Sequence, residues 1–195
     1  MQNSQIKIGL TGNIGSGKST VCQIFEAFNV PVYYSDIKAK ELIQTDTVLI
    51  SFFRKIFGND IYTNQQLDTK KVSEIIFKQK ELLQEIENAV HPAVMKDFER
   101  WTQNQKTSIR IFESAILFEK GYFQFFDKII FISAPEKLRI ERVMNRDSLT
   151  KKEVINRINN QWKEEKKISL CDYVIVCDDV SPVIPQFLNI FKNLL

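Results

Sequence analysis

The sequence is poor in cysteine and histidine and has no long apolar run. Its three cysteines, Cys22, Cys171 and Cys177, are too few for a disulfide framework, and the five residues between the last two do not match zinc-ligand spacing. No apolar stretch is long enough to cross a bilayer, and the polar residues at the start do not resemble a secretory leader. We therefore expect a reduced, cytoplasmic protein with no membrane partner.

The sequence also lacks a strong excess of charge of either sign, since 27 Lys and Arg against 24 Asp and Glu leave a net charge of +3. That charge is too mild to imply nucleic acid. Residues 136–167 nevertheless hold ten Lys or Arg against six Asp or Glu, a surplus of four, so the rest of the chain is near −1. This predicts one dedicated anion-facing element. Nucleic-acid binding by Lys151–Lys167 has little support, because aromatic residues are few there apart from Trp162.

The chain of 195 residues is expected to form a single domain, 1–195, with insertions. Five short apolar stretches, often β-branched, indicate strands that are buried on both faces. They are Ile6–Leu10, Val30–Tyr34, Ser108–Phe112, Lys128–Ser133 and Tyr173–Cys177. Helical patterns alternate with them, which predicts a three-layer α/β/α fold with a five-stranded parallel sheet and right-handed crossovers.

The interval after the second strand is too long for a simple crossover and predicts a helical insertion at residues 36–104. Its amphipathic helices are expected to break at the turn signal Gly58-Asn59-Asp60 and again at His91-Pro92. Pro92 should begin the helix Ala93–Trp101, because proline is favoured at the first helical position.

A second long interval predicts another insertion at residues 136–169, a helical pair around Asp147-Ser148. The remaining segments, 1–35, 105–135 and 170–195, then form the core. No internal repeat or low-complexity linker separates these parts.

The segment Gly12–Ser19 reads G-x-x-x-x-G-K-S directly after a predicted strand and before an apolar helical pattern. This is the context of a P-loop. Glycines let main-chain N–H groups approach phosphate oxygens, and the helix N-terminus adds positive potential there. Lys18 can reach the outer phosphates, and the Ser19 hydroxyl can bind Mg²⁺. A flexible glycine turn alone would need neither residue, so the loop is predicted to hold a nucleoside triphosphate.

Asp36 follows the predicted strand Val30–Tyr34 and begins a helical pattern. In open parallel sheets ligands lie beyond the carboxyl ends of the strands, so Asp36 should face the same crevice as the P-loop. A carboxylate there can accept the proton of an attacking hydroxyl, but it can also simply cap the helix. The residue type alone leaves both interpretations open.

Three arginines, Arg139, Arg142 and Arg146, recur at spacings of three and four and are expected to share one helix face. A triphosphate would balance their charge, and such a helix on an insertion suits a lid that excludes water. The alternative is a solvated basic face with pairs to Glu141 and Asp147.

These segments together resemble the dephospho-CoA kinase family, P-loop kinases that phosphorylate the ribose 3′-hydroxyl of dephospho-CoA. "GLTGNIGSGKST" is similar to the nucleotide loop, "YYSDIKAKELI" to the D-A-D-x-x-A segment and "RIERVMNRDSLTKKEVINRINNQ" to the lid. "FGNDI", "LDTKKVSEIIF" and "ENAVHPAV" resemble the acceptor-binding insertion, and "ESAILFEKG" and "CDYVIVCDD" resemble two core segments. The resemblance covers nearly the whole chain and implies a P-loop NTPase fold of the adenylate kinase-like kind.

The resemblance implies ATP and Mg²⁺ as cofactors, with Ser19 as metal ligand, and Asp36, Lys18, Arg142 and Arg146 as catalytic residues. Asp36 would be the base against the 3′-hydroxyl. ATP would contact Arg142 and the whole loop: Gly12, Asn13, Ile14, Gly15, Ser16, Gly17, Lys18, Ser19 and Thr20. Residues 36–104 would bind the acceptor, and residues 136–169 would be the lid.

Several positions depart from the family pattern. Thr69 stands where the family has arginine, so Lys70 or Lys71 would take over that acceptor contact, and we assign it to Lys70. His91, which residue chemistry alone would make a structural cap, matches the family's H-P pair and is assigned to the acceptor site. The other departures are Asn13 for glycine, Tyr34 for aspartate, Ser35 for alanine, Ala115 for proline, Arg139 for glutamine and Cys177 for asparagine.

The predicted function is transfer of a phosphoryl group from ATP to dephospho-CoA, the last step of coenzyme A biosynthesis. One rival is a related nucleoside or nucleotide kinase, which would act on another acceptor. The other rival is a P-loop regulatory module, which would need neither an acceptor base nor an arginine lid. We expect ATP and dephospho-CoA as small-molecule partners, no nucleic acid, no membrane, and a monomer or small homo-oligomer.

Overall fold

The computed structural model describes residues 5–195, except for the side chains of residues 77, 78 and 80. Backbone contacts divide the chain into two compact units. The first contains the residues up to Tyr33 together with Gln105–Leu195, and the second is Tyr34–Asn104. Among the described residues, no helix combines the length and the apolarity needed to span a membrane.

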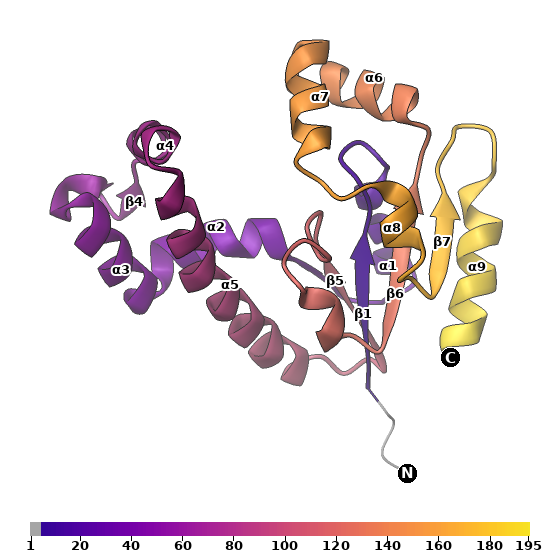
Figure 1. The fold of residues 1–195 in the computed structure, drawn as a ribbon. Coiled ribbons are helices and arrows are strands. Elements are labelled where there is room, and N and C mark those ends of the chain that lie inside the picture. The colour runs from indigo at the N-terminus through magenta and orange to yellow at the C-terminus, as the bar shows by residue number, and fades with distance from the viewer. Residues whose placement is uncertain (1–4) are drawn as a thin grey trace. The chain divides into compact units, whose positions relative to one another are not determined.

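The first unit is built on a five-stranded parallel sheet with the strand order β2-β5-β1-β6-β7 (Figure 1). Its strands are β1 (Ile6–Thr11), β2 (Val32–Tyr34), β5 (Ile109–Glu113), β6 (Lys128–Ser133) and β7 (Tyr173–Val176). Its helices are α1 (Lys18–Ala27), η2 (Tyr122–Phe125), α6 (Glu136–Asp147), α7 (Lys151–Asn159), α8 (Glu164–Ile168) and α9 (Val183–Leu194). All five predicted strands are confirmed.

The central strands consist of apolar residues because the sheet is buried on both faces. Ile8 and Leu10 of β1 and Ile111 of β5 are fully buried, as are Ile130 and Ile132 of β6. β1 pairs in parallel with β5 on one side and with β6 on the other. This explains why the strands could be recognised as short apolar runs rather than as alternating patterns.

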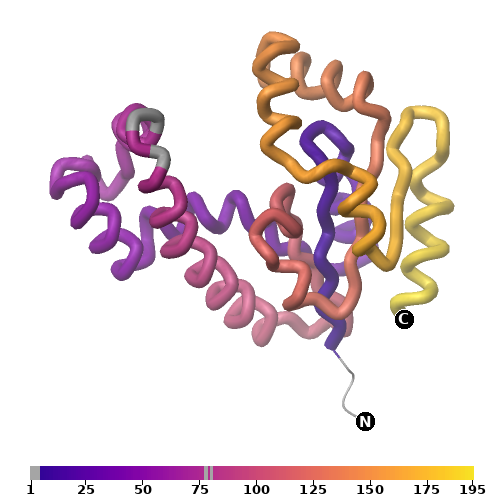
Figure 2. The backbone as a smooth tube through the Cα atoms, in the orientation of Figure 1, coloured from indigo at the N-terminus to yellow at the C-terminus, as the bar shows by residue number. Residues whose placement is uncertain are grey.

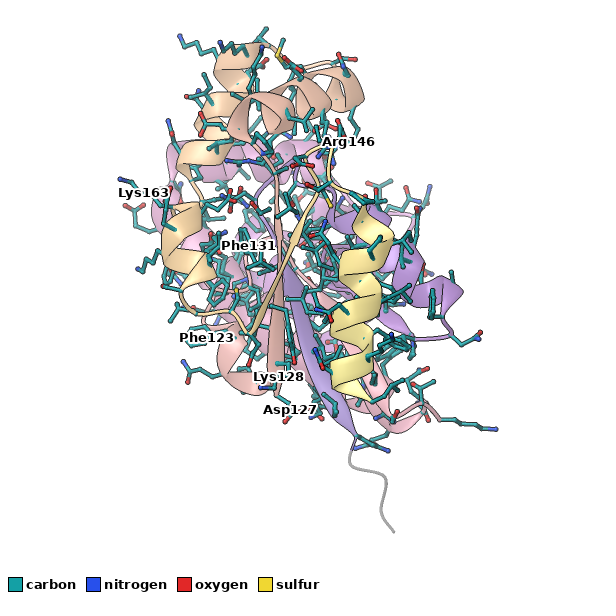
Figure 3. All side chains as sticks on the ribbon, turned by 90° about the vertical axis from the view of Figure 1, so that its right-hand side faces the viewer. Phe123, Asp127, Lys128, Phe131, Arg146 and Lys163 are labelled. Atoms are coloured by element: carbon teal, nitrogen blue, oxygen red, sulfur yellow. The ribbon has the colours of Figure 1, made fainter. Side chains whose placement is uncertain are left out.

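Helices cover the sheet on both sides, and α8 and α9 lie on opposite faces (Figure 3). On the α9 side, the rings of Phe25 in α1 and Phe187 in α9 meet edge to face at 4.9 Å. On the α8 side, Phe118 stacks with Trp162 at 6.4 Å. The expected three-layer α/β/α architecture is confirmed.

The helical pair α6 and α7 follows β6 and lies above the loop that follows β1 (Figure 1). α6 ends because Ser148 adopts a left-handed conformation with φ 53°. α7 begins with a capping box in which the Thr150 side chain accepts from the Glu153 N–H and the Glu153 carboxylate accepts from the Thr150 N–H. The predicted break at Asp147-Ser148 is confirmed, whereas the short helix α8 was not predicted.

The second unit is mainly helical. Its helices are α2 (Ser35–Thr45), α3 (Thr47–Phe57), η1 (Asn59–Ile61), α4 (Thr69–Lys78) and α5 (Lys80–Gln103), and a hairpin joins β3 (Tyr62–Thr63) to β4 (Gln66–Leu67). The predicted break at Gly58 is confirmed, since Gly58 ends α3 with φ 94°.

The prediction that Pro92 begins a helix is wrong. α5 continues through Pro92, and Figure 2 traces it as one uninterrupted helix. An interior proline costs about 3 kcal/mol because it removes a main-chain hydrogen bond and crowds the preceding turn. Val90, Val94 and Phe98 lie four residues apart on one face and are all buried. Burying such side chains contributes roughly 1.5–3 kcal/mol each, which offsets the cost of the proline.

Candidate functional site

The glycine-rich loop runs from the end of β1 into α1 and is shaped by its glycines. Gly15 and Gly17 have φ values of 79° and 98°, which other residues rarely adopt. A Cβ on Gly12 would lie 2.5 Å from the Ile132 carbonyl oxygen, and one on Gly15 would lie 2.5 Å from the Arg139 carbonyl oxygen. The loop is therefore pressed against β6 and α6 and has no room for larger residues.

The side chain of Lys18 reaches back across the loop to its first glycine. Its Nζ donates to the Gly12 carbonyl oxygen at 3.0 Å. Ser19 and Thr20, the next two residues, are exposed in the first turn of α1. Gly17 is the N-cap and provides no side-chain cap. The N-terminus of α1 thus presents main-chain N–H groups and a positive end of the helix dipole.

The residues present fit a bound phosphate group. Ser16 is 1% exposed, and its hydroxyl has no hydrogen-bond partner. Leaving a buried polar group unpaired costs about 1–3 kcal/mol, so such a group in a glycine cradle suggests a site for a polar ligand. The described residues contain no group of three or more His, Cys, Asp or Glu that could hold a metal ion. Ser19 has a hydroxyl that could hold a Mg²⁺ ion together with phosphate oxygens.

Arg142 connects α6 to two loops. Its guanidinium donates to the carbonyl oxygens of Gly15 at 3.3 Å and Cys177 at 3.0 Å, and it pairs with Asp179. Cys177 is buried beside Gly17, and burial raises the pKa of its thiol. The structure thus brings two predicted site elements together, the nucleotide loop and Arg142, and adds the segment that follows β7, which was not predicted as part of the site.

Arg146 extends from the last turn of α6 and is mostly exposed (Figure 3). Its Nε donates to Asp147 at 2.8 Å, and Arg157 donates to the same carboxylate at 3.2 Å. The hydrogen bond from Arg146 lowers the pKa of Asp147 and raises the pKa of Arg146. The pairing with Asp147 that the solvated-face alternative expects is therefore present.

The three arginines lie on the single helix α6, but Arg139 is buried, whereas Arg142 and Arg146 are partly and mostly exposed. Arg139 is 4% exposed and donates from Nε to the Ala134 carbonyl oxygen at 3.0 Å. Its Nη2 lies 3.7 Å from Glu164 and 3.8 Å from Glu136. These carboxylates balance the charge of Arg139, which packs behind the loop rather than facing solvent.

Two further side chains hold this region together but carry no signal in the sequence. The Gln161 amide bonds to the nucleotide loop and to the loop after β5. Lys167 is fully buried, and its Nζ lies 2.7 Å from Glu119, which is 10% exposed. The partners lie 46 to 147 residues apart in the chain, so local patterns could not reveal them.

Asp36, Lys70 and His91 belong to the second unit. Asp36 is exposed in the first turn of α2, whose N-cap is Tyr34 without a side-chain cap. Asp36 is therefore not the helix cap that the alternative interpretation proposed. Lys70 is exposed at the start of α4, whereas Lys71 pairs with Asp60 at 2.5 Å. His91 is half-buried inside α5.

These features together are those of a P-loop kinase: a parallel sheet, a glycine-rich loop between its first strand and the following helix, and an adjoining helix that carries arginines. The chain matches the dephospho-CoA kinase family over residues 6–182. It is 34% identical over 190 residues to the dephospho-CoA kinase of Bacteroides fragilis strain YCH46, covering 97% of this chain and 93% of that protein. The chain belongs to the dephospho-CoA kinase family, which confirms the resemblance seen in its sequence.

Solved structures share the fold. A protein from Thermus thermophilus, TT1252, matches with a TM-score of 0.83 at 27% identity and covers 98% of this chain and 96% of its own. The dephospho-CoA kinase from Campylobacter jejuni matches with a TM-score of 0.70 at 22% identity, over 100% of this chain and 98% of its own. The predicted P-loop kinase fold is thereby confirmed, and the family match and the curated relatives confirm the classification as a kinase.

Proposed function

We propose that this chain transfers the γ-phosphoryl group of ATP to the ribose 3′-hydroxyl of dephospho-CoA, giving coenzyme A and ADP. Membership of the dephospho-CoA kinase family supports the substrate pair. The single observation that carries the chemistry is that Lys18 and Arg142 both donate to main-chain carbonyl oxygens of the Gly12–Thr20 loop, which brings two cations to it. Phosphoryl transfer needs mainly positioning and charge neutralisation, which this arrangement supplies.

The loop and Lys18 bind the phosphates. We propose that Lys18 exchanges its hydrogen bond to the Gly12 carbonyl oxygen for the β- and γ-phosphates, while main-chain N–H groups at the start of α1 hold the phosphate oxygens. Ser19, which is exposed in the first turn of α1, would hold Mg²⁺, which when bound supplies positive charge to the phosphate chain.

Arg142 and Arg146 act from the lid. Both extend from α6, and their present partners, Asp179 and Asp147, are exposed or partly exposed carboxylates that an incoming triphosphate can replace. Guanidinium groups suit this task because they match planar phosphate oxygens with several donors. We propose that both arginines stabilise the charge on the transferring phosphoryl group.

Asp36 is the proposed general base, and Lys70 and His91 are proposed acceptor contacts. Asp36 and Lys70 are exposed and His91 is half-buried, so each can present its side chain to a ligand. A carboxylate that accepts the 3′-hydroxyl proton makes the oxygen a better nucleophile. Lys70 offers positive charge to an acceptor that carries phosphates. The cytoplasmic location and the oligomeric state remain predictions.

An ADP-release assay with a panel of acceptors tests this function. The wild-type chain is incubated with ATP, Mg²⁺ and either dephospho-CoA, adenosine, AMP or no acceptor. Dephospho-CoA should stimulate ADP release far above the other three mixtures. Stimulation by adenosine or AMP instead would favour the related-kinase alternative, and release that no acceptor stimulates would favour a regulatory ATPase.

A further inference from the structure

Gln161 lies between α7 and α8, in a connection that passes beside the loop following β1 (Figure 1). Its side chain joins two loops that are far apart in the sequence. The Ile14 N–H donates to Gln161 Oε1 at 2.8 Å, and Gln161 Nε2 donates to the Ala115 carbonyl oxygen at 3.2 Å. The Gln161 main-chain N–H donates to Ile158 at 3.0 Å, which anchors the residue to the end of α7.

These two partners require an amide. Ile14 offers a donor and Ala115 offers an acceptor, so the bridging group must accept on one side and donate on the other. A neutral amide does both within one planar group, whereas a carboxylate only accepts. The length also matters, because asparagine is shorter by one methylene and could not reach both loops from the same backbone position.

Gln161 and Arg142 hold neighbouring residues of the nucleotide loop. Gln161 accepts from Ile14, and Arg142 donates to the Gly15 carbonyl oxygen at 3.3 Å. Both side chains come from the segment 136–169, one near each end. The loop main chain is thus held at the N–H of the Asn13–Ile14 peptide and at the carbonyl group of the Gly15–Ser16 peptide, on either side of the bond between Ile14 and Gly15. Because the following N–H groups continue from this segment, its orientation sets the direction in which they point.

We propose that Gln161 is a positioning residue for phosphoryl transfer, fixing the nucleotide loop against the lid segment and the loop after β5. The inference rests on the proposed binding of ATP to Gly12–Thr20. Gln161 does not touch the reacting atoms in this account. It acts through the main-chain N–H of Ile14, and its loss should impair the alignment of the transferred group more than the affinity for ATP.

Two variants separate this role from simple stability. Gln161→Met keeps the side-chain length but removes both hydrogen bonds. It should lower kcat about 10- to 100-fold, as small misplacements of bound groups do, while the Kd for ATP changes less than about threefold. Gln161→Glu keeps the acceptor for Ile14, but its carboxylate cannot donate to Ala115. When protonated, the same carboxyl regains a donor. The ratio of its kcat to that of wild type should therefore rise as the pH falls from 8 to 5.5, whereas the ratio for Gln161→Met should stay flat.

Gln186 provides the matched control. Its amide also makes an accept-and-donate pair, with Val176 at 2.8 and 3.0 Å, and it is also half-buried. Gln186→Met should lower thermal stability, but it should not produce a selective fall in kcat at an unchanged Kd for ATP. The proposal is overturned if Gln161→Met keeps the wild-type kcat, or if its affinity for ATP falls by the same factor as its kcat. It is also overturned if the kcat of Gln161→Glu relative to wild type does not rise at low pH. A wild-type chain without acceptor-stimulated ADP release would instead overturn the proposed function itself.

Discussion

The Arg142 guanidinium donates to the main-chain carbonyl oxygen of Gly15, although the two residues lie 127 positions apart in the chain. This contact joins the arginine helix α6 to the nucleotide loop. Arg142 also bonds to Cys177 and Asp179. Arg146, in contrast, is mostly exposed and pairs with the neighbouring, partly exposed Asp147 carboxylate.

Arg146→Ala should lower kcat about 10²- to 10³-fold, the range found when one donor to transition-state charge is removed. The Kd for ATP should change much less, because the loop and Lys18 still hold the phosphates. Single-turnover kinetics and equilibrium ATP titration measure the two effects. Arg157→Ala is the matched control, since Arg157 shares the Asp147 carboxylate but has no proposed catalytic role. A loss of ATP affinity equal to the loss of kcat would make Arg146 a docking residue only.

Asp36→Asn should lower turnover about 10²- to 10⁴-fold while ATP still binds, because an amide cannot accept the hydroxyl proton. ATP affinity and steady-state ADP release are measured side by side. Asp46→Asn is the control: Asp46 caps α3 in the same unit, and asparagine caps a helix as well as aspartate does. Unchanged turnover in Asp36→Asn would remove the base assignment.

Lys167→Met should destabilise the protein by about 3–5 kcal/mol, because it leaves the largely buried Glu119 without its cation. Adding Glu119→Gln should recover much of that loss, since the amide is neutral and its oxygen can still accept from the Trp162 N–H. Chemical denaturation of the wild type, the two single variants and the double variant gives the coupling energy between Lys167 and Glu119. Additive losses in the double variant would show that the pair is not energetically coupled.

The cysteines should react slowly in the folded protein. Burial raises the pKa of Cys171 to about 12 and also raises the pKa of Cys22 and Cys177. A raised pKa keeps the thiol protonated at neutral pH, and only the thiolate is a good nucleophile. Iodoacetamide at pH 8 should therefore modify the native protein slowly and the urea-unfolded protein quickly, as counted by mass spectrometry. Rapid native labelling at Cys171 would contradict this account.

The sequence was most informative where the chemistry is local. Strands buried on both faces require apolar residues throughout, so β1 and β6 were recognisable from their composition. The P-loop was equally clear, because each of its residue types has a separate physical task.

Features that depend on distant packing could not be foreseen. Pro92 is tolerated inside α5 because buried residues on one helix face compensate for it. The β3–β4 hairpin turns through Asn64 and Gln65, which have φ values of 51° and 65° without a glycine to signal the turn. Gln161 was within the recognised lid segment, but its partners are remote in the chain.

The most direct test of the proposed transfer to the ribose 3′-hydroxyl is the position of the new phosphate in the product. The wild-type chain is incubated with ATP, Mg²⁺ and dephospho-CoA, and the product is examined by ³¹P NMR, with the 3′-deoxy analogue of the acceptor as control. We expect one new phosphomonoester on the ribose 3′-oxygen and none with the analogue. A phosphate on another hydroxyl, or equal turnover of the 3′-deoxy analogue, would contradict it.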